Sequence, residues 1–354
     1  MESYAVTHTL GRGAFGQVRR AIHLPTGELA AVKTVFVRTV DGNAANVDGD
    51  LALPRNLFRE LNALRACEGP HVVRLREAFA TGRSLAMVLE HCDTDLRTVL
   101  ERSRGQMSEA AAKAVATQVL AAVAHVHACG VLHRDVKSAN FLFTRRGRLK
   151  LADFGLARPL AHGGAADTEG ARSSGACTPT AAGTRWYRAP ELLFGATSYG
   201  AGSDVWAAAC VCHEAADARA QPPCQGDSDV HQIALTARLL GAPAHAEEAR
   251  LDACPDYRKL TLSHDAPYSD EESAHKARAR RLLRGRRGGS YASLRSLLSD
   301  ALRWTPHDRP AARDLRSRAW FFVPPEPLEE EQLVDAIIVP ALEGGAKPSG
   351  DDEW

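Results

Sequence analysis

Features that mark several other classes of protein are missing from this chain of 354 residues. It has no uninterrupted apolar stretch long enough to cross a bilayer, so we expect no membrane insertion. Its first residues lack the basic and then apolar segments of a secretory signal, so we do not expect a secreted protein. Its 8 cysteines lack the paired spacing of a metal site, which indicates reduced thiols in the cytoplasm or nucleus.

Neither sign of charge is in excess. The 44 Lys and Arg residues almost match the 43 Asp and Glu residues, which gives a formal net charge of +1. This balance gives no reason to expect nucleic acid as a partner. A hydrophobic fraction of 45% is ordinary for a folded protein, and the length suits one large or two modest domains.

The chain does contain one dense group of polar residues. They form two runs, His133-Arg134-Asp135-Val136-Lys137-Ser138-Ala139-Asn140 and Asp153-Phe154-Gly155. Two carboxylates and an amide oxygen can hold divalent cations and orient a hydroxyl group. A lone His-Arg-Asp is more often a buried histidine beside a structural ion pair, but the spacing to Asn140 and Asp153 makes chance a poor explanation.

A glycine-rich segment lies close to the N-terminus, between an expected strand at residues 4–10 and another at residues 17–21. Its glycines, Gly11, Gly13 and Gly16, permit a tight turn and allow backbone N–H groups to approach phosphate oxygens. This spacing alone could also open a dinucleotide-binding unit. Because a strand rather than a helix is expected to follow, the pattern favours a hairpin that covers nucleotide phosphates.

The next expected strand, at residues 28–33, ends at Lys33, and a helix with apolar spacing is expected around residues 57–64. Lys33 is suited to reach nucleotide phosphates, and Glu60 on the helix is its candidate partner. Most strand lysines and helix carboxylates are simply solvated. The glycine-rich hairpin before Lys33 and the apolar residues around Glu60 favour the functional pair.

Further along, strands are expected at residues 71–75 and 85–89. A long alanine-rich helix is expected over residues 108–127, with a serine cap at its start. His125 and His127 near its end are expected to be surface residues rather than ligands.

The segment at residues 156–184 is rich in Gly, Ala, Ser and Thr and is expected to be a loop. It contains Thr178 and Thr180, and a phosphate on either one could pair with Arg134 and Arg158 and order the loop. The alternative is a disordered tip without function. The sequence favours Thr180 only slightly over Thr178 as the phosphorylated residue.

These motifs resemble those of protein kinases, and three further strings narrow the resemblance: Leu57-Phe58-Arg59-Glu60, Thr184-Arg185-Trp186-Tyr187-Arg188-Ala189-Pro190-Glu191 and Leu239-Leu240-Gly241-Ala242-Pro243. The span 4–322 resembles a cyclin-dependent-kinase-like catalytic domain of the CMGC group, most similar to cell-cycle-related kinase. The resemblance implies an α+β, bilobal protein-kinase fold. Its N-lobe, residues 1–90, would be an antiparallel sheet with one helix, and its C-lobe, residues 91–322, would be mainly helical. A C-terminal tail at residues 323–354, rich in Pro and Glu, is expected to be loosely packed.

The same resemblance implies ATP and Mg²⁺ as cofactors and a role for each motif residue. Asp135 would orient the substrate hydroxyl, Lys137 would neutralise charge on the transferred group, and Asn140 and Asp153 would hold Mg²⁺. Asp95 is also expected to begin a short helix. The nucleotide site would comprise Leu10, Gly11, Gly13, Gly16, Val18, Ala31, Lys33, Glu60, Asp95 and Leu142, together with Glu90 and Cys92, whose backbone groups would contact adenine.

The resemblance also implies a type of substrate and a mode of regulation. Lys137 and Thr184 fit Ser/Thr rather than Tyr substrates, and Arg188 is linked in this group to a preference for Pro after the phosphorylated residue. Glu191 would pair with Arg309. The residues expected to be regulatory are Arg134, Thr178, Thr180 and Arg188.

The family implies a role in the cell cycle or the cilium, protein substrates with Ser/Thr-Pro sites, and a cyclin or other activating partner. The helix that carries Glu60 lacks the Pro-Ser-Thr-Ala-Ile-Arg-Glu string of cell-cycle members, which leaves cyclin dependence open. Ser138 stands where relatives usually carry Pro. A basic cluster within residues 276–287 is expected to be a solvated face, or else a docking or nuclear-import patch.

Two other functions are compatible with parts of this pattern. A pseudokinase would bind a partner without turnover, and a small-molecule kinase would share the fold but act on free metabolites. The Ala-Pro-Glu element and the long loop before it favour protein substrates. A pseudokinase is disfavoured because the whole catalytic set is present, namely Lys33, Glu60, Asp135, Asn140 and Asp153.

Overall fold

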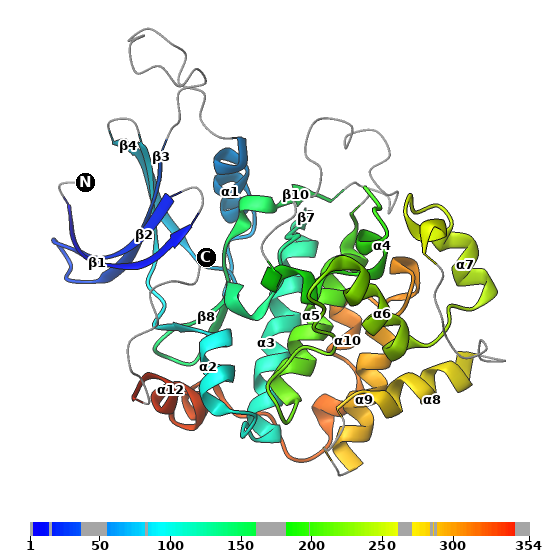
Figure 1. Ribbon diagram of the computed structural model, residues 1–354. Coiled ribbons are helices and arrows are strands. Elements are labelled where there is room, and N and C mark those ends of the chain that lie inside the picture. The colour runs from blue at the N-terminus through cyan, green and yellow to red at the C-terminus, as the bar shows by residue number, and fades with distance from the viewer. Residues whose placement is uncertain are drawn as a thin grey trace, which may run out of the picture.

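The computed structural model describes residues 3–13, 16–36, 55–81, 84–160, 182–197, 199–260, 271–283, 286 and 289–343. A small lobe built on a β-sheet stands beside a larger lobe built from helices (Figure 1). The bilobal α+β fold expected from the sequence is therefore confirmed. Within the described ranges, no helix combines the length and apolar character needed to cross a bilayer.

The small lobe is a five-stranded antiparallel sheet with the strand order β1-β2-β3-β5-β4. Its strands are β1 (Tyr4–Gly13), β2 (Gly16–His23), β3 (Leu29–Phe36), β4 (Leu75–Thr81) and β5 (Ser84–Glu90). Side chains alternate between the two faces, so Met87 and Val35 face helix α1 (Arg55–Ala66) and pack on its buried Leu57 and Leu61. This packing fixes the helix that carries Glu60 against the strand that carries Lys33.

One predicted strand in this lobe was wrong. Residues 71–75 were expected to form it, but β4 begins only at Leu75. The residues before it leave the sheet and contact the other lobe, where Val73 N donates to Leu151 O and Leu151 N donates to His71 O. Apolar residues predict burial here, but the partner is a strand of the large lobe rather than the sheet.

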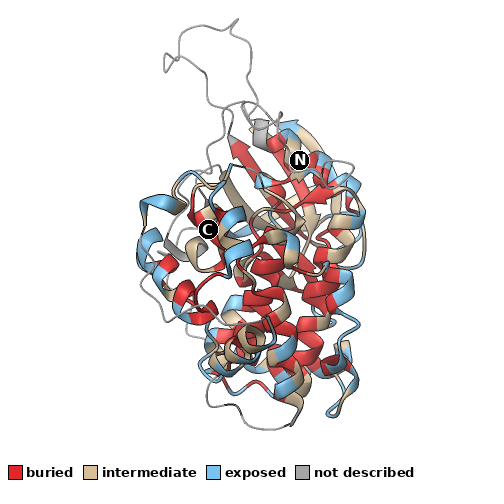
Figure 2. Cartoon of the chain, turned by 90° about the vertical axis from the view of Figure 1, so that its right-hand side faces the viewer, coloured by how far each residue is buried: buried red, intermediate tan, exposed pale blue. Residues whose placement is uncertain are grey.

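The large lobe is organised around two buried helices, α3 (Glu109–Ala128) and α5 (Ala201–Ala216), which pack against each other. Buried residues fill the interior of this lobe (Figure 2). Around them lie α2 (Leu96–Ser103), α4 (Pro190–Leu193), α6 (Asp229–Leu240), α7 (His245–Leu251), α8 (Glu271–Arg281), α9 (Gly289–Ala301) and α10 (Ala312–Leu315). Short strands carry the polar motifs: β6 (Thr94–Asp95), β7 (Val131–Leu132), β8 (Phe141–Phe143), β9 (Leu149–Leu151) and β10 (Arg158–Pro159). Three 3₁₀ turns matter below: η1 (Ser138–Asn140), η2 (Phe154–Leu156) and η3 (Ala182–Tyr187).

Local signals define the ends of α3 as predicted. The Ser108 hydroxyl accepts a hydrogen bond from Ala111 N at its start, and Gly130 just past its end has a φ of +71°, which suits glycine.

The expectation that the two histidines near the end of α3 lie on the surface was wrong. His125 contacts Cys67 O at 3.1 Å, and His127 contacts the Asp204 carboxylate at 3.0 Å. Both rings lie where another segment covers the end of the helix.

The expectation of a loosely packed tail was also wrong for its described part. The chain after residue 323 forms α11 (Glu330–Leu333), a π-helical turn η7 (Val334–Ile338) and α12 (Val339–Glu343). Leu333 and Ile338 are almost fully buried against the large lobe. The ammonium of the buried Lys113 donates to Val323 O and Pro325 O and so fixes the point where the tail begins.

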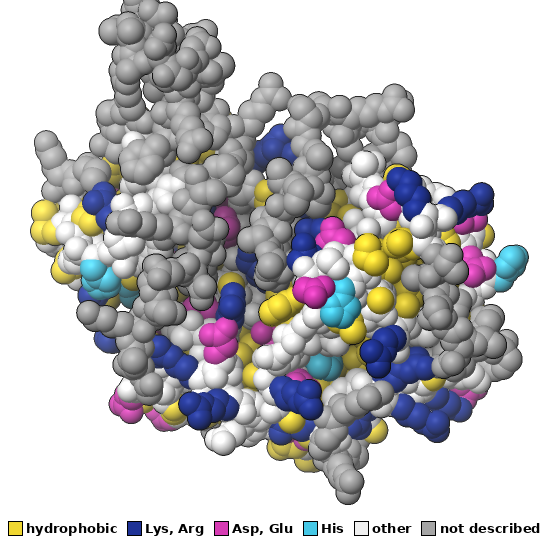
Figure 3. All heavy atoms as spheres, in the orientation of Figure 1, with side chains coloured by type: hydrophobic (Ala, Val, Ile, Leu, Met, Phe, Trp, Pro, Cys, Tyr) yellow, Lys and Arg dark blue, Asp and Glu magenta, His cyan; other side chains and the backbone are white. Residues whose placement is uncertain are grey.

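The basic cluster is only partly a solvated face. Lys and Arg side chains gather on the surface in the region of α8 (Figure 3). Arg278, however, is buried beside Ser299 Oγ, and Arg286 donates to Ala216 O and Gly105 O. These arginines hold the lower part of the large lobe together, which corrects the expectation that the cluster is simply solvated.

Candidate active site

A three-residue ionic contact joins the two lobes. Lys33 Nζ on β3 lies 2.7 and 3.0 Å from the two carboxylate oxygens of Glu60 on α1, and 3.2 Å from Asp153 Oδ1. Burial opposes the charged ammonium, but Asp153 and Glu60 together outweigh burial and raise the pKa of Lys33. The Lys33 ammonium in turn lowers the pKa of Asp153. The lysine is therefore a fixed cation at the boundary between sheet and helices, and the predicted Lys33–Glu60 pair is present.

The catalytic run of the sequence forms a compact group beside this contact. Lys137 Nζ lies 3.0 Å from Asp135 Oδ2, and Asn140 Nδ2 donates to the same oxygen at 3.0 Å and to Asp135 O at 2.7 Å. The other carboxylate oxygen, Asp135 Oδ1, is buried and has no hydrogen-bond partner among the described residues. A buried acceptor of this kind needs a donor that the described residues do not provide, such as a substrate hydroxyl.

Backbone contacts tie the two motifs together. Ala152 N donates to Asn140 O at 2.8 Å, and His133 Nε2 lies 2.9 Å from Ala152 O. The Phe154 ring meets the His133 ring edge-on, with centroids 4.7 Å apart. Asp153 adopts a left-handed backbone with a φ of +59°, which turns its half-exposed side chain toward Lys33.

The glycine-rich segment forms the predicted hairpin between β1 and β2, with Gly13 opposite Gly16. A Cβ atom at Gly16 would lie 2.1 Å from Thr34 O, so only glycine fits this close approach. Gly11 pairs with Val18, and Val18 pairs with Lys33 on β3. The hairpin is thus in register with the strand that carries the lysine.

The other residues expected around the nucleotide lie along the same boundary. Ala31 on β3 pairs with Leu89 on β5, one residue before the connection between the lobes. Leu142 on β8 is half-buried, and Leu10 on β1 is 39% exposed. Side chains of both charges are exposed between the sheet and the helices in the space-filling view (Figure 3).

The connection between the lobes contains Glu90 and Cys92. The Glu90 carboxylate forms an ion pair with Lys150 at 2.7 Å and accepts a hydrogen bond from Arg74 N, so its side chain is occupied. Burial raises the pKa of the Cys92 thiol, which therefore stays neutral. The Glu90 backbone N–H also donates to Arg74 O, and a contact of the remaining backbone groups with adenine stays a prediction.

Asp95 carries out the structural role expected of it. Its carboxylate caps α2 by accepting from Thr98 N at 2.9 Å and from Thr98 Oγ1 at 2.7 Å. The helix start predicted at this residue is confirmed. Both carboxylate oxygens are engaged in the cap, and a contact of Asp95 with a nucleotide stays a prediction.

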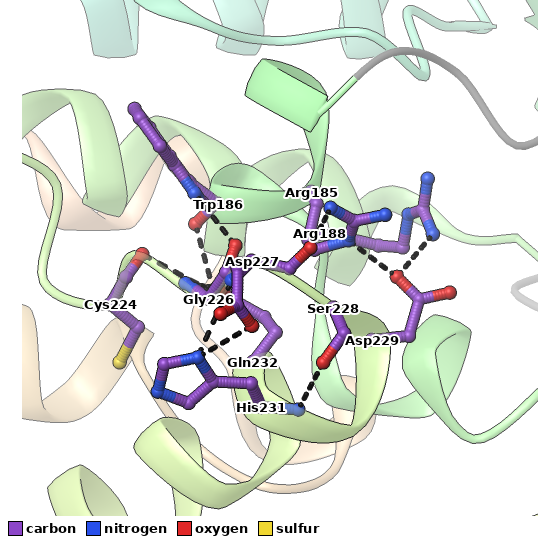
Figure 4. A network of polar contacts seen from close by, with 10 residues as sticks. All are labelled: Arg185, Trp186, Arg188, Cys224, Gly226, Asp227, Ser228, Asp229, His231 and Gln232. Carbon is purple, nitrogen blue, oxygen red and sulfur yellow. Dashed lines mark hydrogen bonds and ion pairs between the residues drawn. The ribbon is translucent and has the colours of Figure 1, made fainter.

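Of the expected regulatory residues, Thr178 and Thr180 lie outside the described residues. The Arg134 guanidinium stacks on the Tyr199 ring at 5.0 Å. Arg188 binds the carboxylate of Asp229 at the start of α6, and the same carboxylate binds Arg185 at 2.8 Å (Figure 4).

The segment that follows the loop is docked on α6 by further contacts (Figure 4). Trp186 Nε1 donates to Gly226 O at 3.0 Å, and Gln232 Oε1 accepts from Gly226 N. Below it, the expected pair of Glu191 and Arg309 forms two hydrogen bonds of 2.9 and 2.7 Å in the core. The segment that leads from the loop into α4 is therefore held at both ends.

The residues at the lobe boundary offer a suitable donor set for Mg²⁺. Asn140 uses its amide nitrogen toward Asp135, which leaves its amide oxygen as a possible ligand, and the Asp153 carboxylate is half-exposed. Among the described residues, no three His, Cys, Asp or Glu side chains are grouped to hold a metal unaided. Mg²⁺ is commonly held by one or two protein oxygens together with substrate phosphates and water, so an amide oxygen and a carboxylate suit it.

Two further residues contribute to this region, although no sequence motif points to them. Asp204 accepts hydrogen bonds from His133 N and Arg134 N, both at 2.9 Å, and so fixes the backbone at the start of the catalytic run. Glu214 contacts Ser138 and Tyr187. Both residues lie on α5, far from the catalytic run in the sequence, and no local pattern indicates these contacts.

The two-lobed fold and the lysine–carboxylate site at its boundary define a protein kinase. Comparison with known families agrees, because the protein kinase domain model matches residues 4–321. The chain is 32% identical over 349 residues to cyclin-dependent kinase 20 of Rattus norvegicus, covering 98% of this chain and 90% of that protein. It has the same identity and coverage with the Homo sapiens protein of that name.

A second relative is cyclin-dependent kinase-like 4 of Mus musculus, 37% identical over 241 residues, or 68% of this chain and 64% of that protein. The chain belongs to the protein kinase family, and within it to the cyclin-dependent-kinase-like kinases of the CMGC group. It is a protein serine/threonine kinase, as the sequence predicted.

Proposed function

We propose that this kinase transfers the γ-phosphate of ATP to Ser or Thr residues that precede Pro in proteins, within one catalytic domain at residues 4–322. The observation that carries the proposal is the position of Lys33 Nζ between Glu60 and Asp153. An ammonium held by two carboxylates, one from each lobe, provides a fixed positive charge for the triphosphate.

Each residue of the catalytic run has a role that follows from its contacts. Asp135 orients the substrate hydroxyl or accepts its proton. It does so through the buried Oδ1, which has no hydrogen-bond partner among the described residues. Lys137 lies against the other oxygen of Asp135 and stabilises negative charge on the transferred group. Because the transition state needs little covalent help, placing these groups correctly accounts for most of the catalysis.

Asn140 and Asp153 would hold Mg²⁺ through an amide oxygen and a carboxylate. The bound ion would supply positive charge that screens the phosphate oxygens. The hairpin at Gly13 and Gly16 would bring backbone N–H groups close to the phosphates. Backbone groups of Glu90 and Cys92 that are not engaged elsewhere would contact adenine.

The preference for Pro is proposed from Arg188 and its surroundings. Arg188 and Arg185 share the carboxylate of Asp229, so the substrate-facing segment after the loop is held to α6 (Figure 4). Arginine at this position is associated with Pro-directed CMGC kinases, and the names of the relatives also indicate cyclin-dependent enzymes. We propose by the same reasoning a cyclin or other activating partner, work in the cytoplasm, nucleus or cilium, and regulation by phosphate on Thr178 or Thr180.

Phosphorylation of a peptide library tests activity and specificity together. We expect incorporation into Ser/Thr-Pro peptides, loss of incorporation in Asp153→Asn, and a preference for Pro that falls about tenfold in Arg188→Ala. The exposed Arg313 provides a matched control, because Arg313→Ala should leave the preference unchanged.

Two results would contradict the proposal. The first is absence of incorporation by the wild-type protein even when Thr178 or Thr180 is phosphorylated and candidate partners are present, which would favour a pseudokinase. The second is transfer to choline or free sugars but not to peptides, which would favour a small-molecule kinase.

A further inference from the structure

Three buried hydroxyl and carboxyl groups meet beneath the catalytic run. Ser138 belongs to the turn η1 and lies between Lys137 and Asn140, whereas Tyr187 ends η3. Glu214 comes from the central helix α5. The three residues are 0, 8 and 5% exposed, so water does not easily complete their hydrogen bonding.

The three groups form a closed ring of short oxygen–oxygen contacts. Ser138 Oγ lies 3.1 Å from Glu214 Oε1, Tyr187 Oη lies 2.8 Å from Glu214 Oε2, and the two hydroxyl oxygens are 2.9 Å apart. Each contact is short enough to be a hydrogen bond, and each hydrogen bond needs one proton. The ring therefore needs three protons.

The protonation state of Glu214 decides whether the ring can be satisfied. With an ionised carboxylate, only the hydroxyls of Ser138 and Tyr187 supply protons. In one of the three contacts, two oxygen atoms would then face each other without a proton between them. With a neutral carboxylic acid, Glu214 donates to Ser138, Ser138 donates to Tyr187, and Tyr187 donates back to Glu214. Every group then donates once and accepts once.

The buried surroundings of Glu214 and Tyr187 favour the protonated forms that the ring needs. Burial raises the pKa of Glu214 to about 7, although the hydroxyls of Tyr187 and Ser138 lower it. Burial also raises the pKa of Tyr187 well above its usual value, so the phenol keeps its proton.

Charged and titratable groups on the neighbouring elements have opposing effects on the protonation of Glu214. On α2, Arg97 favours the ionised form of Glu214 and Glu101 opposes it, and these two residues form an ion pair with each other at 2.8 Å. Cys210, one turn earlier on α5, also faces the ring and is held neutral by burial. On the side of the catalytic run, Asp135 and Lys137 neutralise each other at 3.0 Å.

We propose that Glu214 carries a proton in the active kinase, and that the Ser138–Tyr187–Glu214 ring positions the catalytic run against the substrate-binding segment. Loss of the proton opens the ring and displaces η1, which carries Asn140 and follows Lys137 directly, so phosphoryl transfer slows as pH rises. Glu214 is thus a positioning residue. The inference rests on the proposed roles of Lys137 and Asn140.

The pH dependence of kcat in the wild type and in Glu214→Gln tests this directly. A glutamine cannot ionise, and its amide donates to Ser138 while its carbonyl accepts from Tyr187, so it mimics the neutral acid. Between about pH 6 and pH 9 we expect the ratio of wild-type kcat to Glu214→Gln kcat to fall at least about tenfold. Taking the ratio cancels the ionisation of ATP and of the peptide. Ratios that stay constant in two folded proteins would overturn the proposal.

A double-mutant cycle separates positioning from simple loss of stability. In a Ser138→Ala background the catalytic run no longer contacts Glu214, so Ser138→Ala and Ser138→Ala/Glu214→Gln should share one pH profile. A pH-dependent difference between them as large as that between the wild type and Glu214→Gln would show that Ser138 does not transmit the effect.

Infrared difference spectroscopy measures the proton without relying on activity. The wild type should show a protonated-carboxyl band at about pH 6 that fades by about pH 9 and is absent from Glu214→Gln. If the band is missing at the lower pH, the proposal fails even if the kinase is active. If the band is present but the wild type transfers no phosphate, the proposed function fails instead.

Discussion

The carboxylate of Asp204 is fully buried and accepts hydrogen bonds from several segments at once. His133 N and Arg134 N donate at 2.9 Å, Tyr199 Oη donates at 3.0 Å, and His127 Nε2 lies at 3.0 Å. Burial alone would raise the pKa of Asp204, but the hydrogen bonds and the neighbouring histidines outweigh burial and lower it. This one carboxylate holds the backbone from which Asp135 extends.

The Asp204→Asn variant should therefore be less stable at neutral pH, by about 3 kcal/mol, because an amide group turns an N–H toward donors. A lowered pKa in the folded state means that the stabilisation is present above the unfolded value of about 4 and is lost as pH falls through the folded value. Melting temperatures measured against pH should fall in acid for the wild type and change less for Asp204→Asn. Asp252→Asn, at the surface, should leave the melting temperature unchanged.

At the scale of single residues, the sequence predicted which residues form the site better than it predicted all the contacts that those residues make. Lys33, Glu60 and Asp153 were predicted from short motifs and from the strand and helix expected around them, because these signals are local. The contacts of Glu214 could not be predicted, because they depend on three segments that meet only after folding. His127 was expected on the surface for the same reason, since its partner Asp204 lies far away in the sequence.

At the scale of elements, the C-terminal helices belong to the folded core of the large lobe. Ile338 is 1% exposed, whereas Leu342 in the next helix is 47% exposed. The side chain of Arg148 binds the carboxylate of Glu330 at 2.8 Å and fixes the start of α11. The tail thus contributes apolar burial as well as polar anchoring.

Truncation of Ile338 tests how much this packing contributes. Ile338→Ala should lower the free energy of unfolding by about 2–5 kcal/mol, because it removes buried methyl and methylene groups and leaves a cavity. Leu342→Ala is the matched control and should change it by less than about 0.5 kcal/mol. Equal effects of the two variants in urea unfolding would indicate that the tail does not pack on the lobe in solution.

Elements with local start signals were predicted well, and elements without them were not. Ser108 and Asp95 each mark a helix start by capping it, which needs only a few neighbouring residues. The start of β4 and the helices after residue 329 are defined by contact with distant segments. The high Pro and Glu content of the tail concealed the buried apolar positions that give it structure.

At the scale of the whole molecule, the contact of Lys33 with Asp153 and Glu60 joins the two lobes by charge at the proposed nucleotide site. If the proposed site binds ATP with Mg²⁺ only in the folded state, the nucleotide must raise the melting temperature. Binding at 100 times the dissociation constant stabilises a protein by about 2.7 kcal/mol. The part of this stabilisation that comes from the phosphates should depend on the Lys33 ammonium.

The Lys33→Met variant distinguishes the stabilisation that comes from the phosphates from the stabilisation that comes from the adenosine part of the nucleotide. The variant should show a much smaller thermal shift with ATP and Mg²⁺ than the wild type, because the triphosphate loses its fixed cation. With adenosine, which has no phosphates, the two proteins should shift equally. Because Lys33→Met also leaves Glu60 buried without its partner, each shift is measured from that protein's own ligand-free melting temperature. A loss of the adenosine shift as well would mean that the substitution disturbs the whole cleft, and an unchanged ATP shift would mean that Lys33 does not contact the phosphates.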